Sequence, residues 1–209
     1  MIPFLLTPSG KDYVWGGTRL RDEFHKILDV EPLAETWECS THPDGPCFVA
    51  SGPFKGQTLT SLLHENPSLL GTSLSGVTDL PILIKFIDAR ENLSVQVHPD
   101  DEFALECENG QLGKTEMWYV VDADTDAELI IGFKHDSSPE EFIEAVEQNR
   151  VEDLLHKQVV HKDEVFFLPA GRIHAIGKGL LIAEIQQTSD ITYRIYDFNR
   201  TDDAGNTRE

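Results

Sequence analysis

Segments of strand length follow one another closely from residue 80 onward, and mostly short connections separate them. They occupy 81–87, 93–98, 116–121, 127–133, 164–168, 180–186 and 192–198. Antiparallel neighbours need only short connections, whereas parallel neighbours need long crossovers, so this spacing indicates antiparallel sheets. Many short strands with turn residues between them are typical of a β-sandwich or jelly roll. We therefore predict a mainly β protein.

Helical patterns are few. Residues 137–155 open with serines, a proline and acidic residues, and their apolar positions repeat at helical spacing, which predicts one small helical insertion. An amphipathic pattern at 58–70 predicts a short helix, which Thr58 or Thr60 could cap.

The remaining segments are punctuated by glycine and proline. Residues 3–38 are expected to wrap the core irregularly, with a possible strand at 37–40. Gly177 and Gly179 predict a hairpin turn between two strands, because no helical pattern follows them as a phosphate-binding loop would require.

Length and charge restrict the class of protein. The chain has 209 residues, and we expect 1–209 to form a single domain. Its formal net charge of -20 argues against a surface that binds nucleic acid or an anionic membrane. An anionic small molecule would need a local basic pocket, which draws attention to Lys85, Lys114 and Arg194.

The cysteines and the N-terminus indicate the compartment. Cys39, Cys47 and Cys107 show no C-x-x-C spacing and are expected to be reduced. The first eight residues are too short and too proline-broken for a signal peptide, and no apolar run approaches the roughly 20 residues of a membrane helix. We expect a cytoplasmic protein, either a monomer or a weak homo-oligomer.

Potential metal ligands lie at the ends of three predicted strands. Period-two geometry places Ser94, Gln96 and His98 on one face of their strand. Glu116 shares a face with Lys114 in the next strand, and His174 follows a Pro-x-Gly turn. Imidazole and carboxylate ligands are typical of a divalent metal site.

The metal site is inferred from the four residues together, because each of them alone could have a purely structural role. His98 could simply end a strand before a proline, Glu116 could form a surface ion pair with Lys114, and His174 could cap a hairpin. An amide ligand from Gln96 is neutral and weaker than a third histidine, so it would suit a Lewis acid more than a redox centre.

Two cations interrupt apolar strand patterns. Lys85 lies within 82–87 and Arg194 lies between Tyr193 and Ile195. A buried cation without a partner is costly. Lys85 could extend to solvent at a strand edge, but the two cations together favour a phosphate or carboxylate substrate.

Several segments resemble one family. Residues 85–89, 93–101, 113–118, 169–174 and 186–197 together resemble the type I mannose-6-phosphate isomerases, or phosphomannose isomerases, of the short bacterial kind. The pattern Pro-x-Gly-x-x-His is also similar to the second motif of cupins, and Gln-Val-His stands where many cupins have His-x-His. The resemblance covers nearly the whole chain and implies a cupin jelly roll with one zinc ion per chain.

The resemblance also implies roles for individual residues. The implied zinc ligands are Gln96, His98, Glu116 and His174. The implied substrate-binding residues are Lys85 and Ser94, which would meet the phosphate, and the implied catalytic residues are Lys114, Glu184 and Arg194. The family interconverts mannose 6-phosphate and fructose 6-phosphate by proton transfer through a cis-enediol.

Either Glu184 or Lys114 could carry the proton. Arg194 is expected to stabilise the intermediate. Some relatives carry a histidine where this chain has Gly113, so a mechanism that requires that histidine is not expected here.

Two alternatives remain open. Two histidines, a glutamate and a fourth ligand could hold iron or manganese in a dioxygenase, although its pocket would be expected to be apolar. The chain could instead be a noncatalytic sugar-phosphate-binding domain, because relatives continue beyond the polar stretch at 201–209 and the C-terminal part of the family is expected to be missing.

Overall fold

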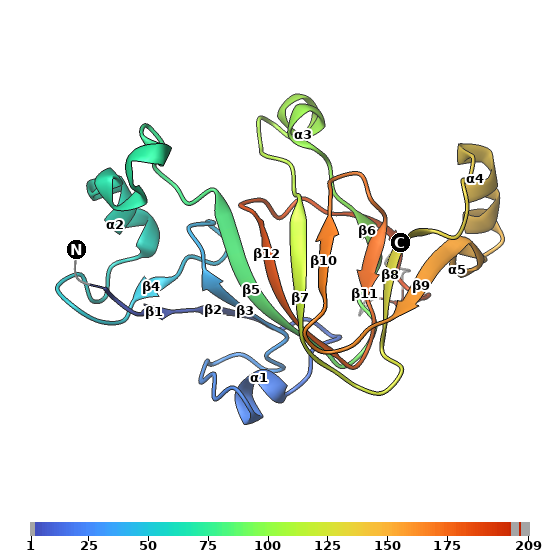
Figure 1. Ribbon diagram of the computed structural model, residues 1–209, viewed down its shortest axis with the longest axis horizontal. Helices are drawn as coiled ribbons and strands as arrows, with labels where there is room; N and C mark the ends of the chain where they lie inside the picture. The colour runs from blue at the N-terminus through green and yellow to red at the C-terminus, as the bar shows by residue number, and fades with distance from the viewer. Residues whose placement is uncertain (1–2, 202–204, 206–209) are drawn as a thin grey trace.

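Two antiparallel sheets form the body of the protein in this computed structural model, which describes residues 3–201 and 205 (Figure 1). In this described part, the larger sheet has six strands in the order β10 (Val165–Leu168), β7 (Glu116–Ala123), β12 (Leu180–Gln187), β5 (Ile82–Ala89), β3 (Glu35–Cys39) and β2 (Ser9–Lys11). The smaller sheet has five, in the order β13 (Tyr193–Tyr196), β6 (Val95–Val97), β11 (His174–Ile176), β8 (Glu128–Phe133) and β9 (Leu155–Val159). The predicted mainly β architecture is confirmed.

Short elements surround the two sheets (Figure 1). The strands β1 (Leu6–Thr7) and β4 (Phe48–Val49) pair with each other. The helices are α1 (Arg19–Asp22), α2 (Leu59–Glu65), α3 (Asp101–Cys107), α4 (Pro139–Glu147) and α5 (Val151–Leu154), with 3-10 turns η1 (Pro67–Leu70) and η2 (Thr72–Leu74). None of the helices in the described ranges has both the length and the apolar character that a membrane span requires.

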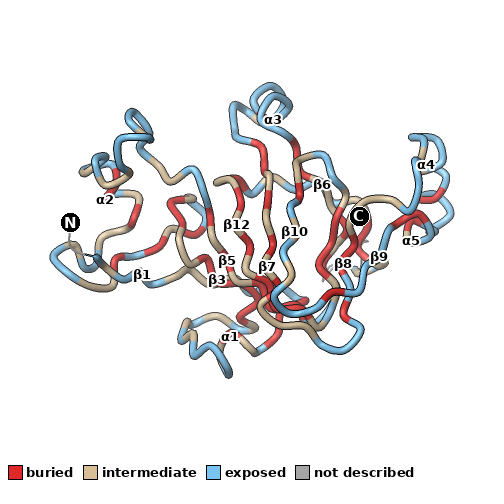
Figure 2. The backbone as a smooth tube through the Cα atoms, in the orientation of Figure 1, coloured by how far each residue is buried: buried red, intermediate tan, exposed pale blue. Residues whose placement is uncertain are grey.

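The core lies between the sheets, and Figure 2 shows buried backbone concentrated along β5, β7, β12 and the strands that face them. One cluster of buried side chains includes Trp118, Val120 and Ile182 from the larger sheet with Leu129 and Ile176 from the smaller one. Because both sheets contribute, the apolar faces of the alternating strands hold the two layers together.

The seven strand predictions are confirmed, with boundaries that differ from the predicted ones by two residues at most. The predicted cap is also confirmed, because the side chain of Thr58 accepts a hydrogen bond from the backbone N–H of Ser61 at the start of α2.

The helical insertion predicted at about 137–155 is confirmed as α4 and α5, and β9 begins at residue 155. Two local predictions were wrong. Gly177 and Gly179 do not close a hairpin, because β11 and β12 lie in different sheets. The segment 3–38 is not only a wrapping segment, since β2 and most of β3 extend the larger sheet.

The turn after His98 also starts a helix that the sequence pattern did not predict. The carboxylate of Asp100 accepts a hydrogen bond from the backbone N–H of Phe103 and caps α3. Residues 202–204 and 206–209, which belong to the polar stretch predicted at the end of the chain, lie outside the described residues.

Gly177 lies where the chain passes from one sheet to the other. A Cβ atom there would lie 2.1 Å from the carbonyl oxygen of Glu128. We expect Gly177→Ala to lower the free energy of unfolding by about 1 to 3 kcal/mol because of this overlap, as measured by urea denaturation. Lys178→Ala, at the exposed neighbouring position, is the control and should change it by less than about 0.5 kcal/mol. Equal stability of both variants would contradict the steric argument.

Candidate metal centre and substrate pocket

A row of polar and aromatic side chains crosses the larger sheet. Lys85 on β5 pairs with Trp37 on β3 and with Glu184 on β12, and Glu184 pairs with Trp118 on β7. Directly paired residues of antiparallel strands project from the same face of a sheet. The register therefore places all four side chains side by side.

A second row crosses the smaller sheet. Gln96 on β6 pairs with Arg194 on β13 and with His174 on β11. The rings of Trp118 and His174 meet edge to face, with centroids 5.4 Å apart. This contact joins one row to the other, so the two rows face each other inside the sandwich.

His98, Glu116 and His174 meet in the interior between these rows. All three are buried, and one ligand atom from each lies within 4.8 Å of the others. The Nε2 atom of His98 is 3.2 Å from Oε1 of Glu116, and the Nε2 atom of His174 is 3.6 Å from Oε2 of Glu116. The three residues predicted from separate strands therefore form one cluster that could hold a metal ion.

The backbone fixes the orientation of both imidazole rings. Nδ1 of His98 lies 2.8 Å from the carbonyl oxygen of Ile191, and Nδ1 of His174 lies 2.8 Å from that of Arg172. A carbonyl oxygen only accepts hydrogen bonds, so in each neutral ring Nδ1 carries the proton and Nε2 presents a lone pair.

These two lone pairs face each other, because the Nε2 atoms of His98 and His174 are only 3.2 Å apart. Two acceptors this close repel unless positive charge lies near them. Oε2 of Glu116 is buried and has no hydrogen-bond partner among the described residues. Two inward-facing nitrogens and an unsatisfied carboxylate oxygen are the donor set that a divalent cation such as zinc prefers.

The ammonium of Lys114 supplies positive charge at this cluster in the structure. Its Nζ atom lies 2.5 Å from Oε1 of Glu116 and 3.1 Å from Nε2 of His98. Burial alone would raise the pKa of Glu116, but Lys114 and the hydrogen bond with His98 hold that pKa well below its usual value. Glu116 is therefore a carboxylate at neutral pH.

The two histidines are held in their neutral form. Burial, assisted by the positive charge of Lys114, lowers the pKa of His98. Burial also lowers the pKa of His174 to about 4. Metal ligation requires a neutral imidazole and an ionised carboxylate, so the cluster has the protonation state of a metal site.

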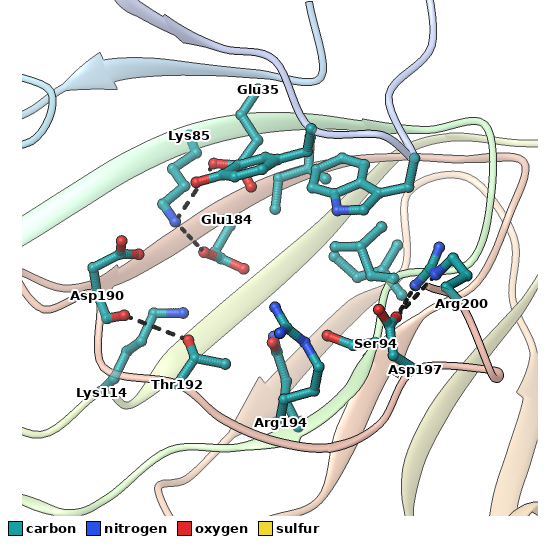
Figure 3. A pocket seen from close by; sticks show the side chains of 16 residues that line it. Glu35, Lys85, Ser94, Lys114, Glu184, Asp190, Thr192, Arg194, Asp197 and Arg200 are labelled. Atoms are coloured by element: carbon teal, nitrogen blue, oxygen red, sulfur yellow. Dashed lines mark hydrogen bonds and ion pairs between the residues drawn. The ribbon is translucent and has the colours of Figure 1, made fainter. Parts of the chain in front are cut away.

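Lys114, which contacts this cluster, also lines a cavity of about 250 Å³ (Figure 3). Its walls include six residues that the sequence singled out, namely Lys85, Ser94, Gln96, Lys114, Glu184 and Arg194. Figure 3 shows Lys85 and Glu184 grouped on one side of the cavity and Ser94 and Arg194 on another. The residues predicted for substrate and catalysis are therefore brought together around one space.

Lys85 is buried on the interior strand β5, so the alternative of a lysine that reaches solvent at a strand edge is wrong. Its Nζ atom lies 3.5 Å from Oε1 of Glu184 and 3.7 Å from Oε2 of Glu35. Burial would lower the pKa of Lys85, but these two carboxylates raise it above its usual value. Burial and the charge of Glu116 raise the pKa of Glu184.

Two other structural alternatives also fail. Glu116 and Lys114 do not form a surface ion pair, because both are buried. His174 does not cap a hairpin but begins β11.

Several residues of the cavity were not predicted from the sequence. They include Tyr13, Trp15, Glu35 and Asp190, which line it, and Trp37 and Trp118, which donate their indole N–H groups to Glu35 and Glu184. Glu35 could have been found from the sequence, because this acidic residue follows the apolar Leu33 and Ala34 and lies two positions before Trp37. Lys85 drew attention for the same reason, since it also interrupts an apolar segment.

Comparison with known proteins identifies the family. The model of the phosphomannose isomerase type I catalytic domain matches residues 4–133. This chain belongs to the type I phosphomannose isomerase family. The mannose-6-phosphate isomerase of Streptococcus mutans is 46% identical over 206 residues, which cover 99% of this chain and 64% of that relative.

Solved structures of phosphomannose isomerases share the fold. The mannose 6-phosphate isomerase from Bacillus subtilis superimposes with a TM-score of 0.92 at 40% identity, over 100% of this chain and 66% of that one. A mannose 6-phosphate isomerase bound with zinc and yttrium has a TM-score of 0.70 at 18% identity, over 98% of this chain and 74% of that one. The cupin-type jelly roll is thereby confirmed, and the chain spans about two thirds of the length of these relatives.

Lys85 neutralises charge that would otherwise be buried. We expect Lys85→Met to lower the free energy of unfolding by about 3 to 5 kcal/mol, because Glu35 and Glu184 lose their common counter-ion. Chemical denaturation measures the loss. Lys157→Met is the matched control, because Lys157 pairs with Glu152 at the surface, and it should cost less than about 1 kcal/mol. Similar losses in both variants would contradict a buried charge cluster.

Proposed function

We propose that this chain carries the active site of a zinc-dependent mannose-6-phosphate isomerase, which interconverts mannose 6-phosphate and fructose 6-phosphate. The observation that carries the proposal is the position of the buried His98, Glu116 and His174 cluster beside a cavity with carboxylate and cationic side chains on its walls. The mannose-6-phosphate isomerase from Streptococcus mutans, at 46% identity, supports this substrate.

The proposed ligands of one zinc ion per chain are Gln96, His98, Glu116 and His174. Gln96 joins the three clustered residues because it pairs in register with His174 and lines the cavity. A bound zinc ion would supply Lewis-acid polarisation of the sugar oxygens. The zinc in the structure of a distant mannose 6-phosphate isomerase agrees with the choice of metal.

Glu184 is the proposed base that moves the proton between C2 and C1 through a cis-enediol. Its Oε1 atom is buried and has no hydrogen-bond partner within residues 3–201, while Oε2 is fixed by the indole N–H of Trp118 at 2.8 Å. A raised pKa makes Glu184 a stronger base than an exposed carboxylate. Lys114 suits this role less well, because a lysine ammonium has three hydrogen-bond donors and no acceptor with which to take a proton.

The cations of the cavity have complementary proposed roles. Lys114, which lies just before β7, and Arg194 on β13 both line the cavity and would stabilise the negative charge of the enediolate as it develops. Lys85 and Ser94 would meet the phosphate. Because Lys85 already lies between two carboxylates, a phosphate dianion needs the added positive charge that Arg194 brings to the same cavity.

The dioxygenase alternative fits the cavity poorly. An oxygenase pocket would be expected to be mainly apolar, whereas this one is lined by charged groups that include Glu35, Lys85, Asp190 and Arg194. Those groups match the charges and hydroxyl groups of a sugar phosphate.

We expect the purified chain to convert mannose 6-phosphate to fructose 6-phosphate, to lose this turnover on chelation and to regain it with added zinc. We expect Glu184→Gln to lower kcat by about 10²- to 10⁴-fold, because a positioned base is lost. A coupled assay measures turnover, and elemental analysis should find unchanged zinc in this variant.

His174→Ala and His161→Ala form the control pair for the metal. His174 is buried in the cluster and His161 is exposed, so zinc content and turnover should fall only in the first variant. Folded, zinc-loaded chain that binds mannose 6-phosphate without turning it over would overturn the isomerase proposal and indicate a binding domain.

A further inference from the structure

Glu35 is a buried acid of the cavity that has no place among the proposed ligands or catalytic groups. It lies on β3, is 6% exposed and lines the cavity. The indole N–H of Trp37, two residues along the same strand, donates a hydrogen bond of 2.8 Å to its Oε2 atom. Burying a carboxylate without an opposite charge costs free energy, so Glu35 needs a positively charged partner.

That partner is Lys85. The strand order β12-β5-β3 places Glu184 on one side of Lys85 and Glu35 on the other. Nζ of Lys85 lies 3.5 Å from Glu184 and 3.7 Å from Glu35, and 4.9 Å from the centre of the Trp37 ring. The ammonium is therefore attracted by both carboxylates and lies close to neither, since a charge-assisted hydrogen bond would be about 2.7 to 2.9 Å long.

The two carboxylates are fixed in a similar manner. Each accepts one indole N–H at 2.8 Å, Glu35 from Trp37 and Glu184 from Trp118. Because neither acid is free to swing toward Lys85, the position of the ammonium decides which oxygens stay available. Oε1 of Glu184 has no hydrogen-bond partner in the described structure.

We propose that Glu35 is a positioning residue that holds the ammonium of Lys85 between two carboxylates and so keeps Oε1 of Glu184 available to the substrate. Without the charge of Glu35, the ammonium would move onto Glu184 and form a one-to-one hydrogen-bonded ion pair. That pair would occupy the oxygen that takes the proton and would weaken the base. The inference rests on the proposed role of Glu184 in the isomerisation.

Loss of the Glu35 charge should affect turnover but should not weaken substrate binding. Glu35→Gln keeps the shape and an oxygen that can accept the Trp37 N–H, but it removes one negative charge from a cavity proposed to take an anionic sugar. Binding of the phosphate is then not weakened, because the ammonium of Lys85 needs to move only a short way to reach Glu184 and stays in the wall of the same cavity. The expected signature is a lower kcat with a KM that does not rise.

The experiment compares three variants of the zinc-loaded chain with mannose 6-phosphate as substrate. Glu35→Gln should lower kcat by about 10- to 100-fold without raising KM. Glu35→Asp keeps the charge and should retain a higher kcat than Glu35→Gln. Glu38→Gln is the matched control on the same strand, because Glu38 pairs with Lys26 and Thr36 instead of a cavity residue, and it should leave both constants unchanged.

Three results would overturn the proposal. One is a kcat of Glu35→Gln within twofold of the wild-type value. Another is a raised KM at constant kcat, which would make Glu35 a direct substrate contact. The third is an equal fall in kcat for Glu38→Gln, which would indicate a general disturbance of β3.

A second measurement does not depend on catalysis and so separates failure of this inference from failure of the isomerase proposal. Glu35→Gln should lower the urea midpoint of unfolding of the wild-type chain, because Lys85 loses a partner. In the Lys85→Met background it should raise the midpoint, because it removes an uncompensated buried charge. A shift of the same sign in both backgrounds would show that Glu35 does not act through Lys85.

Discussion

The repulsion between two imidazole lone pairs is the constraint around which the site is organised. Nε2 of His98 and Nε2 of His174 lie 3.2 Å apart, and backbone carbonyl groups prevent either ring from turning its N–H toward the other. Such a contact is stable only with positive charge beside it. Glu116 adds a carboxylate, and the ammonium of Lys114 supplies the positive charge in this structure. The two Nε2 atoms and the carboxylate of Glu116 would hold a zinc ion in the same place.

Strand register aligns the two rows of side chains that surround this cluster. Pairing across β3, β5, β12 and β7 aligns Trp37, Lys85, Glu184 and Trp118, and pairing across β13, β6 and β11 aligns Arg194, Gln96 and His174. A shift of one residue in any strand would turn its functional side chain to the opposite face. The core between the two sheets therefore stabilises the protein and also sets the geometry of the site.

The sequence predicted the ligands better than their surroundings. Gln96, His98, Glu116 and His174 could be found because strand periodicity reveals which side chains share a face, and the family resemblance assigned their roles. Glu35 was missed because β3 lies in a stretch read as irregular, and its pairing with β5 joins residues far apart in the chain. The carbonyl groups that orient the histidines belong to loops, so no periodic pattern marks them. The helix α3 was missed because it has only seven residues and follows directly on the strand predicted at 93–98.

The central claim is that one divalent cation binds between the two histidines and Glu116. Crystals of the zinc-loaded chain, measured on both sides of the zinc absorption edge, test it most directly. We predict one strong anomalous peak per chain within about 2.0 to 2.2 Å of Nε2 of His98, Nε2 of His174 and a carboxylate oxygen of Glu116. A peak at another position, or no peak with Lys114 still contacting Glu116 and His98, would contradict the account.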